Sequence, residues 1–335
     1  MATWSVARHP GLLGLGATAL GTAAAFGLMQ RRHVHQIRQD PEYARLEDPP
    51  RGRVLSVRSA DGTELHAEVF GDDGAPPVVL AHGWTEALQY WTYVIDDLQA
   101  AGCRAIAFDL RGHGKSQDAA SGEYSLERFG QDIEAVLHAS LAPDERAIVV
   151  GHSLGAMSVV AWAADHDVAA RARAAALLNT GVEDLLAENV VLPGLVAGRI
   201  KETLGRVFMG APGSLPRVST PLSHAAVRYF AFGPEGSPAK VAFFERMLWE
   251  CSPKVRGAVG LSISTMNLST ALECLTVPTL VLAGAEDRLT PSSHARRIAE
   301  RLPHPVGVVE LPATGHMAPL ERPREVSRAI LSMRT

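Results

Sequence analysis

The stretch AIVVGHSLGAMSVV, residues 147–160, places a serine between two glycines after an apolar run. Residues 147–150 have the composition of a buried strand, and the small apolar residues after Gly155 favour a helix. Ser153 therefore stands at a predicted turn from strand to helix. The pattern Gly-x-Ser-x-Gly also arises by chance, so its meaning depends on the rest of the chain.

Other short apolar runs alternate with segments of helical spacing, such as residues 126–141 and 292–302. Two alternating runs about Asp61-Gly62, within residues 53–71, have the pattern of a β-hairpin. Strands that are apolar on both faces and alternate with helices predict an α/β fold with a mostly parallel, covered sheet. The predicted strands are residues 78–83, 104–109, 147–151, 175–179, 279–284 and 306–311.

Residues 182–268 interrupt this alternation with helix-like segments and no convincing strand. We predict that they form a helical cap over the strand ends, inserted between core segments 53–181 and 269–335. The large apolar residues of the cap could line a pocket, but packing is the simpler interpretation. These residues are Phe243, Phe244, Met247 and Trp249.

The first 32 residues contain an uncharged apolar segment, residues 11–29, which has the length that a membrane-spanning helix needs. Arg31 and Arg32 follow it, so the positive-inside bias predicts a single-pass membrane anchor with the bulk of the chain in the cytoplasm. A cleaved signal peptide, followed by secretion, is the alternative, because Ala23-Ala24-Ala25 resembles a cleavage site.

Residues 33–52 are polar and include Pro49-Pro50, which predicts a linker in which His33 and His35 are solvated. The chain has 32 basic and 36 acidic residues and a net charge of -4, so no basic surface for nucleic acid is expected. Three scattered cysteines offer no metal-ligand spacing. The sequence leaves the oligomeric state open.

Polar residues follow several predicted strands, where the carboxyl ends of parallel strands share one edge of the sheet. A nucleophile, a base and an orienting carboxylate brought to that edge would form a catalytic unit. The residues at these strand ends are His82-Gly83-Trp84, Asp109, Ser153, Asp287 and His316.

From about residue 53 to its C-terminus, the chain resembles the serine-nucleophile members of the α/β-hydrolase superfamily. The resemblance implies the α/β-hydrolase fold, with helices on both faces of the sheet and an inserted cap. It rests on AHGW (81–84), DLRGHGKS (109–116), GHSLGA (151–156), GAEDRLTP (284–291) and GHMAPLERP (315–323), which occur in the family's order.

This resemblance implies a role for each matching residue. Ser153 would attack a carbonyl, His316 would accept the hydroxyl proton, and Asp287 would orient the imidazole. The backbone N–H groups of Leu154 and Trp84 would form the oxyanion hole. No residues are assigned to substrate binding, and no cofactor or metal is implied.

Two sets of residues compete with these assignments. Asp109 is an alternative acid, but Asp287 keeps the order serine, aspartate, histidine along the chain. His82 and His152 are expected to hydrogen-bond loops near the serine rather than to catalyse. The side chain of Glu286 is expected to point away from that of Asp287.

A serine at position 153 separates the chain from the superfamily's epoxide hydrolases and haloalkane dehalogenases, which use an aspartate there. Hydrolysis of a carboxylic ester, thioester or acylglycerol is therefore expected, and a membrane anchor would favour a small acyl or lipid ester substrate. Cofactor-free haloperoxidases, acting as perhydrolases, and C–C bond hydrolases share the same triad and remain alternatives. A non-catalytic binding protein is disfavoured because all three triad residues are present.

Overall fold

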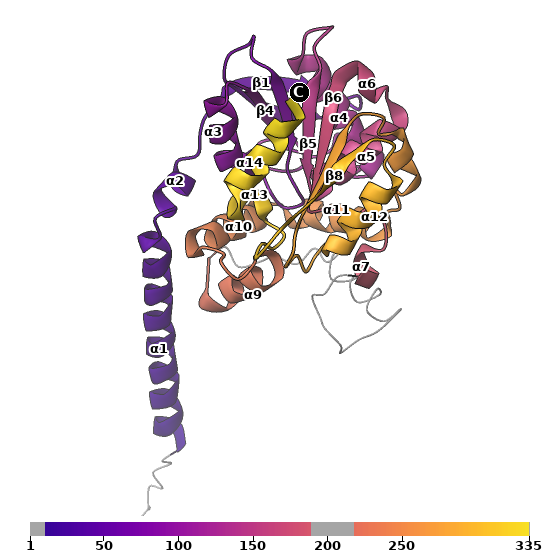
Figure 1. The fold of residues 1–335 in the computed structure, drawn as a ribbon. Helices are drawn as coiled ribbons and strands as arrows, with labels where there is room; N and C mark the ends of the chain where they lie inside the picture. Colours follow the sequence, from indigo (N-terminus) through magenta and orange to yellow (C-terminus); the bar gives the residue numbers. More distant parts are fainter. Residues whose placement is uncertain (1–10, 189–217, 335) are drawn as a thin grey trace, which may run out of the picture.

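The computed structural model describes residues 11–188 and 218–334, with side chains from Ala25 onward. At its centre lies an eight-stranded sheet with the order β1-β2-β4-β3-β5-β6-β7-β8 (Figure 1). The strands are β1 (Arg53–Arg58), β2 (Glu64–Phe70), β3 (Pro77–Ala81), β4 (Arg104–Phe108), β5 (Ala147–His152), β6 (Ala172–Leu178), β7 (Thr279–Gly284) and β8 (Pro305–Leu311).

The pairing of the strands confirms the predicted α/β fold. Strands β1 and β2 form an antiparallel hairpin, and Gly62 in its turn has a φ of 87°, which glycine adopts readily. Strand β2 also runs antiparallel to β4, whereas the neighbours from β4 to β8 all pair in parallel. The carboxyl ends of the parallel strands consequently meet at one edge of the sheet.

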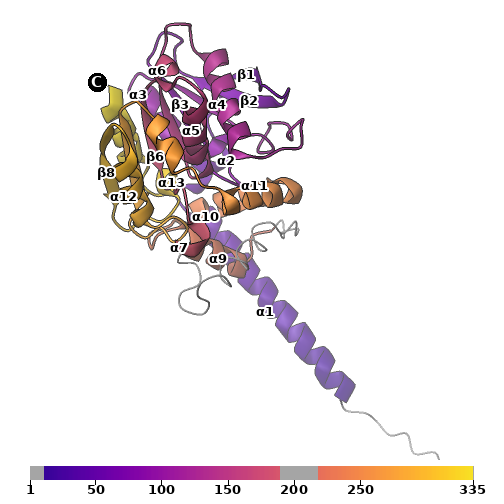
Figure 2. The same ribbon diagram turned by 90° about the vertical axis from the view of Figure 1, so that its right-hand side faces the viewer.

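Helices cover both faces of this sheet. Successive side chains of each strand point to opposite faces, and both faces are apolar. Val79 and Ala81 of β3 belong to the apolar cluster that includes α4 (Leu126–Ser140), α5 (Leu154–Asp165) and α12 (Ser292–Arg301). Val78 and Leu80 belong to the cluster that includes α3 (Thr92–Ala100) and α14 (Pro323–Leu331). Both faces of the sheet are thus buried, as predicted, and Figure 2 shows helices on either side of it.

The described part of the predicted cap is helical and lies at one end of the sheet (Figure 1). Phe243, Phe244 and Met247 are buried in the apolar cluster that also holds α3 and α14, whereas Trp249 is only partly buried. Residues 189–217 of the predicted cap lie outside the described residues. The cap helices are α7 (Leu185–Glu188), α9 (Pro221–Ala231), α10 (Pro238–Glu250) and α11 (Pro253–Thr265).

Short elements complete the described part of the chain. In η1 (Leu88–Trp91), the hydroxyl of Tyr90 lies 3.2 Å from Nε2 of His152 at the end of β5, and α13 (Ala318–Glu321) follows the loop after β8. The short elements are α2 (Tyr43–Glu47), η1 (Leu88–Trp91), α6 (Val168–Arg171), η2 (Thr270–Cys274), α13 (Ala318–Glu321) and η3 (Ser332–Arg334).

Helix α1 (Gly11–Gln39) extends away from the sheet (Figure 1). The predicted membrane span, residues 11–29, lies within α1, largely where no side chains are described. Among the described residues, the structure contains no helix with both the length and the apolar character to cross a membrane. The transmembrane span thus gains no support, and membrane anchoring stays a prediction.

Residues 33–52 differ from the predicted solvated linker, because they contain the end of α1 and all of α2. His33 and Ile37 are buried, since residues four apart share one face of a helix. The imidazole Nε2 of His33 lies 3.0 Å from the hydroxyl of Ser219, next to α9. The prediction was therefore wrong for His33, although His35 is exposed.

Candidate active site

Ser153 lies in the tight turn between β5 and α5, at the position that its flanking glycines predict. Its backbone has a φ of 49° and a ψ of -113°, a conformation that costs a non-glycine residue free energy. A Cβ atom on Gly151 would come within 2.4 Å of the backbone nitrogen of Ala156, and one on Gly155 within 2.2 Å of the carbonyl oxygen of Ala81. Only glycine fits at both places, and Ser153 itself remains partly exposed.

The two predicted oxyanion donors belong to segments that pack against each other. Leu154 is the first residue of α5, where backbone N–H groups have no acceptor within the helix. Trp84 follows Gly83, and a Cβ atom on Gly83 would lie 2.9 Å from Nδ1 of His152. The loop after β3 is therefore in direct contact with the turn that carries Ser153.

His316 and Asp287 form a buried hydrogen-bonded pair. Nδ1 of His316 lies 2.8 Å from Oδ2 of Asp287, and the two residues are 4% and 5% exposed. They come from the loops after β8 and β7, which are neighbours in the sheet. The contact joins residues 29 positions apart along the chain.

The pKa values of this pair move in opposite directions. Burial alone would raise the pKa of Asp287, but attraction to His316 and hydrogen bonds from His316, Asn179 and Thr290 outweigh it and lower the pKa. Burial would lower the pKa of His316, but the charge of Asp287 and its hydrogen bond raise it. Each charge is thus stabilised by the other.

His316 also lies beside the turn that carries Ser153. Its ring centroid is 5.0 Å from that of His152, and its carbonyl oxygen is 2.9 Å from Nε2 of His152. Two hydrogen bonds hold the Ser153 backbone in place: its N–H donates to the carbonyl of Leu178, and its carbonyl accepts from the hydroxyl of Thr180. The structure therefore brings the three predicted triad residues to one edge of the sheet.

The predicted competitors occupy other positions. Asp109 accepts hydrogen bonds from the backbone N–H groups of Leu88 and Lys115, at 2.6 and 2.9 Å. His82 donates from Nδ1 to the carbonyl of Gly83 and accepts at Nε2 from the N–H of Leu110, in the loop after β4. Glu286 is exposed, whereas its neighbour Asp287 is buried.

Two residues that hold Asp287 were not among the predicted site residues. The amide nitrogen of Asn179 donates to Oδ2 of Asp287 at 3.0 Å and to the Gly315 carbonyl at 3.1 Å. The hydroxyl of Thr290 donates to the same Oδ2 at 2.8 Å, and its N–H donates to Oδ1 at 2.9 Å. Asn179 is the last residue of the predicted strand 175–179 and directly follows β6, so the same strand-end rule could have identified it.

Glu321, in α13, ties the loop that carries His316 to the segment that follows α9 in the cap. Its carboxyl oxygens accept from the backbone N–H groups of Gly233, at 2.7 Å, and Gly315, at 2.9 Å. Burial raises the pKa of Glu321 to about 7, against the lowering effect of these hydrogen bonds. The N–H of His316 also donates to the carbonyl of Ala231, in α9, at 2.8 Å.

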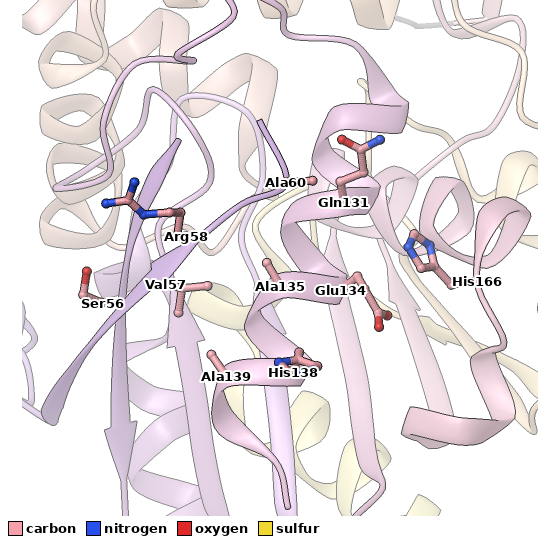
Figure 3. Close-up of a pocket in the computed structure, with 10 residues that line it drawn as sticks. All are labelled: Ser56, Val57, Arg58, Ala60, Gln131, Glu134, Ala135, His138, Ala139 and His166. Carbon is pink, nitrogen blue, oxygen red and sulfur yellow. The ribbon is translucent and has the colours of Figure 1, made fainter. Parts of the chain in front are cut away.

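A separate hollow of about 320 Å³ lies between β1 and α4 (Figure 3). None of the ten residues that line it is a predicted site residue. They are Ser56, Val57, Arg58, Ala60, Gln131, Glu134, Ala135, His138, Ala139 and His166. Within residues 11–188 and 218–334, no group of three or more histidine, cysteine or acidic residues could hold a metal ion.

Comparison with known proteins identifies the family of the chain. The family model described as alpha/beta hydrolase fold matches residues 76–323, well over half of the chain. Epoxide hydrolase A of Mycobacterium tuberculosis is 28% identical over 318 residues, which cover 82% of this chain and 95% of that protein. A bifunctional esterase/perhydrolase of Acinetobacter calcoaceticus is 24% identical over 283 residues, covering 82% and 98%.

Solved structures of hydrolases are also similar to this chain. An esterase from Rhodococcus sp. superposes with a TM-score of 0.67 at 26% sequence identity. The superposition covers 83% of this chain and 97% of the esterase. The similarity therefore extends over nearly the whole length of that protein.

Proposed function

The chain belongs to the α/β hydrolase family, and on that premise we propose that it hydrolyses carboxylic esters through a serine nucleophile. One observation supports the proposal: His316 is hydrogen-bonded to the buried Asp287, and its ring lies against that of His152, the residue next to Ser153 in the strained turn. This is the arrangement that activates a serine hydroxyl for attack on a carbonyl.

The proposed reaction follows from the position of each proton. The hydroxyl of Ser153 attacks the ester carbonyl while Nε2 of His316 takes its proton, and the raised pKa of His316 suits a base that must then hold that proton. The N–H groups of Leu154 and Trp84 donate to the developing oxyanion. His316 returns the proton to the leaving alcohol, and water then releases the acid from Ser153 by the same steps.

The serine also argues against epoxide opening, despite the similarity to an epoxide hydrolase. Attack by Ser153 on an epoxide carbon would produce an ether, which water does not cleave under the conditions of an active site. Attack on an acyl group produces an ester, which the same histidine can help water to hydrolyse. The nucleophile therefore favours acyl substrates.

Perhydrolysis is a second candidate, because one relative is a bifunctional esterase/perhydrolase. In that reaction, hydrogen peroxide replaces water as the acceptor of the acyl group on Ser153. The acyl-enzyme is common to both reactions. Adding hydrogen peroxide to the ester assay and measuring peroxyacid separates the two candidates.

The test is a panel of p-nitrophenyl esters of increasing acyl length, assayed with the wild-type protein and with Ser153→Ala. We expect turnover of at least one ester to fall by about a millionfold in the variant, because the nucleophile is lost. A fluorophosphonate probe should label the wild type and leave Ser153→Ala unlabelled. Equal turnover by the two proteins, or no labelling of either, would contradict the proposal.

A further inference from the structure

Next to the Asp287–His316 pair lies a second buried carboxyl–imidazole pair that the proposed chemistry does not use. It consists of Glu86, in the loop after β3, and His152, the last residue of β5; they are 2% and 0% exposed. Nδ1 of His152 lies 3.1 Å from the carboxyl oxygens of Glu86. Ionisable groups this deeply buried need partners, because unpaired charges are costly there.

The hydrogen bonds of His152 define where its protons lie. Its Nε2 is 2.9 Å from the carbonyl oxygen of His316, which can only accept, so Nε2 carries a hydrogen. Its Nδ1 faces the carboxyl of Glu86, and two facing lone pairs would repel. A hydrogen between Nδ1 and the carboxyl of Glu86 satisfies this contact, so both ring nitrogens of His152 take part in hydrogen bonds.

The same carboxyl group fixes the oxyanion loop. Oε2 of Glu86 accepts a hydrogen bond from the N–H of Gly83 at 2.5 Å. Gly83 immediately precedes Trp84, so this bond sets the direction of the next peptide group. A Cβ atom on Gly83 would lie 2.9 Å from both Glu86 and His152, so the loop fits closely against the pair.

Tyr90, in η1, fixes the imidazole from a third direction. Its hydroxyl is 3.2 Å from Nε2 of His152, and the two ring centroids are 4.7 Å apart. Tyr90 is fully buried, and burial raises the pKa of its phenol well above the ordinary value, so the group stays uncharged. The imidazole of His152 is therefore held at both nitrogens and along its face.

We propose that Glu86 and His152 form a positioning pair that holds three catalytic segments together. These are the oxyanion loop at Gly83-Trp84, the turn that carries Ser153, and the loop that carries His316. The inference rests on the proposed serine hydrolase function. Neither side chain needs to touch the substrate, because each acts through the backbone that it binds.

The expected effect is on turnover rather than on substrate binding. Interactions with the oxyanion form only in the transition state, so misplacing their donors lowers kcat without raising KM. An error of about 1 Å in such a site can cost about a hundredfold in rate. We therefore expect Glu86→Ala to lower kcat by about a hundredfold, with KM within about threefold of wild type.

The conservative variant Glu86→Gln provides a rescue test. Its amide oxygen can accept from Gly83 while its amide nitrogen donates to Nδ1 of His152, so both contacts survive. We expect kcat of this variant to return to within about tenfold of wild type. A loss in Glu86→Ala that Glu86→Gln does not relieve would contradict a positioning role.

Glu68 offers a matched control on β2. It is 5% exposed, and it accepts from the N–H of Gly52 at 2.9 Å and lies 2.9 Å from Nε2 of His66. It thus binds a glycine N–H and an imidazole, as Glu86 does, but outside the candidate active site. Glu68→Ala should lower the melting temperature and leave kcat unchanged.

All rates are expressed per serine labelled by the fluorophosphonate, which removes the contribution of misfolded protein. Wild-type kcat in Glu86→Ala would overturn the inference. If Glu86→Ala does not fold, His152→Asn tests the positioning role instead. Its side-chain amide still faces Glu86, but it loses the contact with the carbonyl of His316. We expect it to lower kcat about tenfold, and an unchanged kcat would overturn the inference.

Failure of the proposed function gives a different pattern. If no ester is turned over but the wild type is still labelled, the ester proposal fails, and the labelling rates of the wild type, Glu86→Ala and His152→Asn decide the inference. A slower rate in the variants supports it, and equal rates overturn it. No labelling of the wild type overturns both proposals.

Discussion

Two buried aspartates at the carboxyl edge of the sheet have opposite electrostatic environments. Asp109 follows β4 and Asp287 lies after β7, and they are 1% and 5% exposed. The pKa of Asp109 is raised, mainly by burial, whereas that of Asp287 is lowered in spite of burial. Burial alone therefore does not distinguish them.

The carboxyl group of Asp109 is held mainly by backbone hydrogen bonds. Its carboxyl oxygens accept from the backbone N–H groups of Leu88 and Lys115. His82 lies 3.9 Å away, but burial lowers its pKa well below the ordinary value, and its Nε2 accepts from the N–H of Leu110. His82 is thus neutral, and Asp109 serves to fix a turn.

Asp287 differs because its partners include an imidazole that can be charged. His316, Asn179 and Thr290 all approach Oδ2, at 2.8 to 3.0 Å. These contacts favour the carboxylate, and the carboxylate in turn favours a protonated His316. The difference teaches that the identity of the hydrogen-bond donors, rather than depth, separates a structural aspartate from a candidate catalytic one.

The largest expected effect comes from exchanging each aspartate for asparagine. Asp287→Asn should lower kcat/KM by about ten-thousandfold with little change in stability, because His316 loses the group that orients it and stabilises its cation. Asp109→Asn should instead lower the free energy of unfolding by about 1–3 kcal/mol, with kcat per labelled serine unchanged.

Ester kinetics and chemical denaturation of the two variants check this pair of predictions. The fluorophosphonate titration again separates lost folding from lost activity. A loss of turnover in Asp109→Asn as large as that in Asp287→Asn would remove the distinction between the two sites.

A smaller effect is expected in the pH dependence. His316 can act as a base only when it is neutral, and its pKa is raised above 6.5, so kcat/KM should increase with pH with a midpoint above 6.5. In Asp287→Asn the carboxylate charge that raises the pKa of His316 is gone, while burial still lowers that pKa. The residual activity should therefore have a pH midpoint below that of the wild type. Asp109→Asn should keep the wild-type midpoint.

The measurement is the pH profile of kcat/KM for one ester without an ionisable acyl group. Identical midpoints in the wild type and Asp287→Asn would show that Asp287 does not control the pKa of His316.

The smallest effect is expected from the side chains that support each aspartate. Asn179→Ala removes one hydrogen bond to Asp287 and one to Gly315, and should lower kcat about tenfold. Ser116→Ala is the matched control, because its hydroxyl donates to the carbonyl of Asp109 at 2.6 Å. Ser116→Ala should lower the melting temperature and leave kcat unchanged. Steady-state kinetics and thermal unfolding of both variants check this, and a loss of kcat in Ser116→Ala equal to that in Asn179→Ala would contradict the prediction.

The local features of the fold were predictable from the sequence. The hairpin about Asp61-Gly62 and the parallel strands appear where alternation and apolar runs place them. The helices expected at residues 126–141 and 292–302 are α4 and α12, each within a residue of the predicted bounds. These strands, helices and the hairpin depend on residues that are close together in the chain, so a sequence pattern is sufficient to predict them.

The N-terminal region shows where such patterns are insufficient. The polar residues 33–52 suggested a linker, yet His33, Ile37 and Leu46 are buried. Helices α1 and α2 contact the cap helices α9 and α10, and His33 lies 3.0 Å from the hydroxyl of Ser219, just before α9. Local composition holds no information about a partner that lies nearly two hundred residues away.

The sequence by itself determined the α/β fold and the order of a serine, an aspartate and a histidine at successive strand ends. Only the tertiary structure decided that His316 meets Asp287 rather than Asp109, that Asn179 supports this contact, and that Glu86 pairs with His152. The physical reason is range. Periodicity and turn preferences act between neighbours, whereas these contacts join residues 29 to 108 positions apart and exist only after the sheet has aligned its strands.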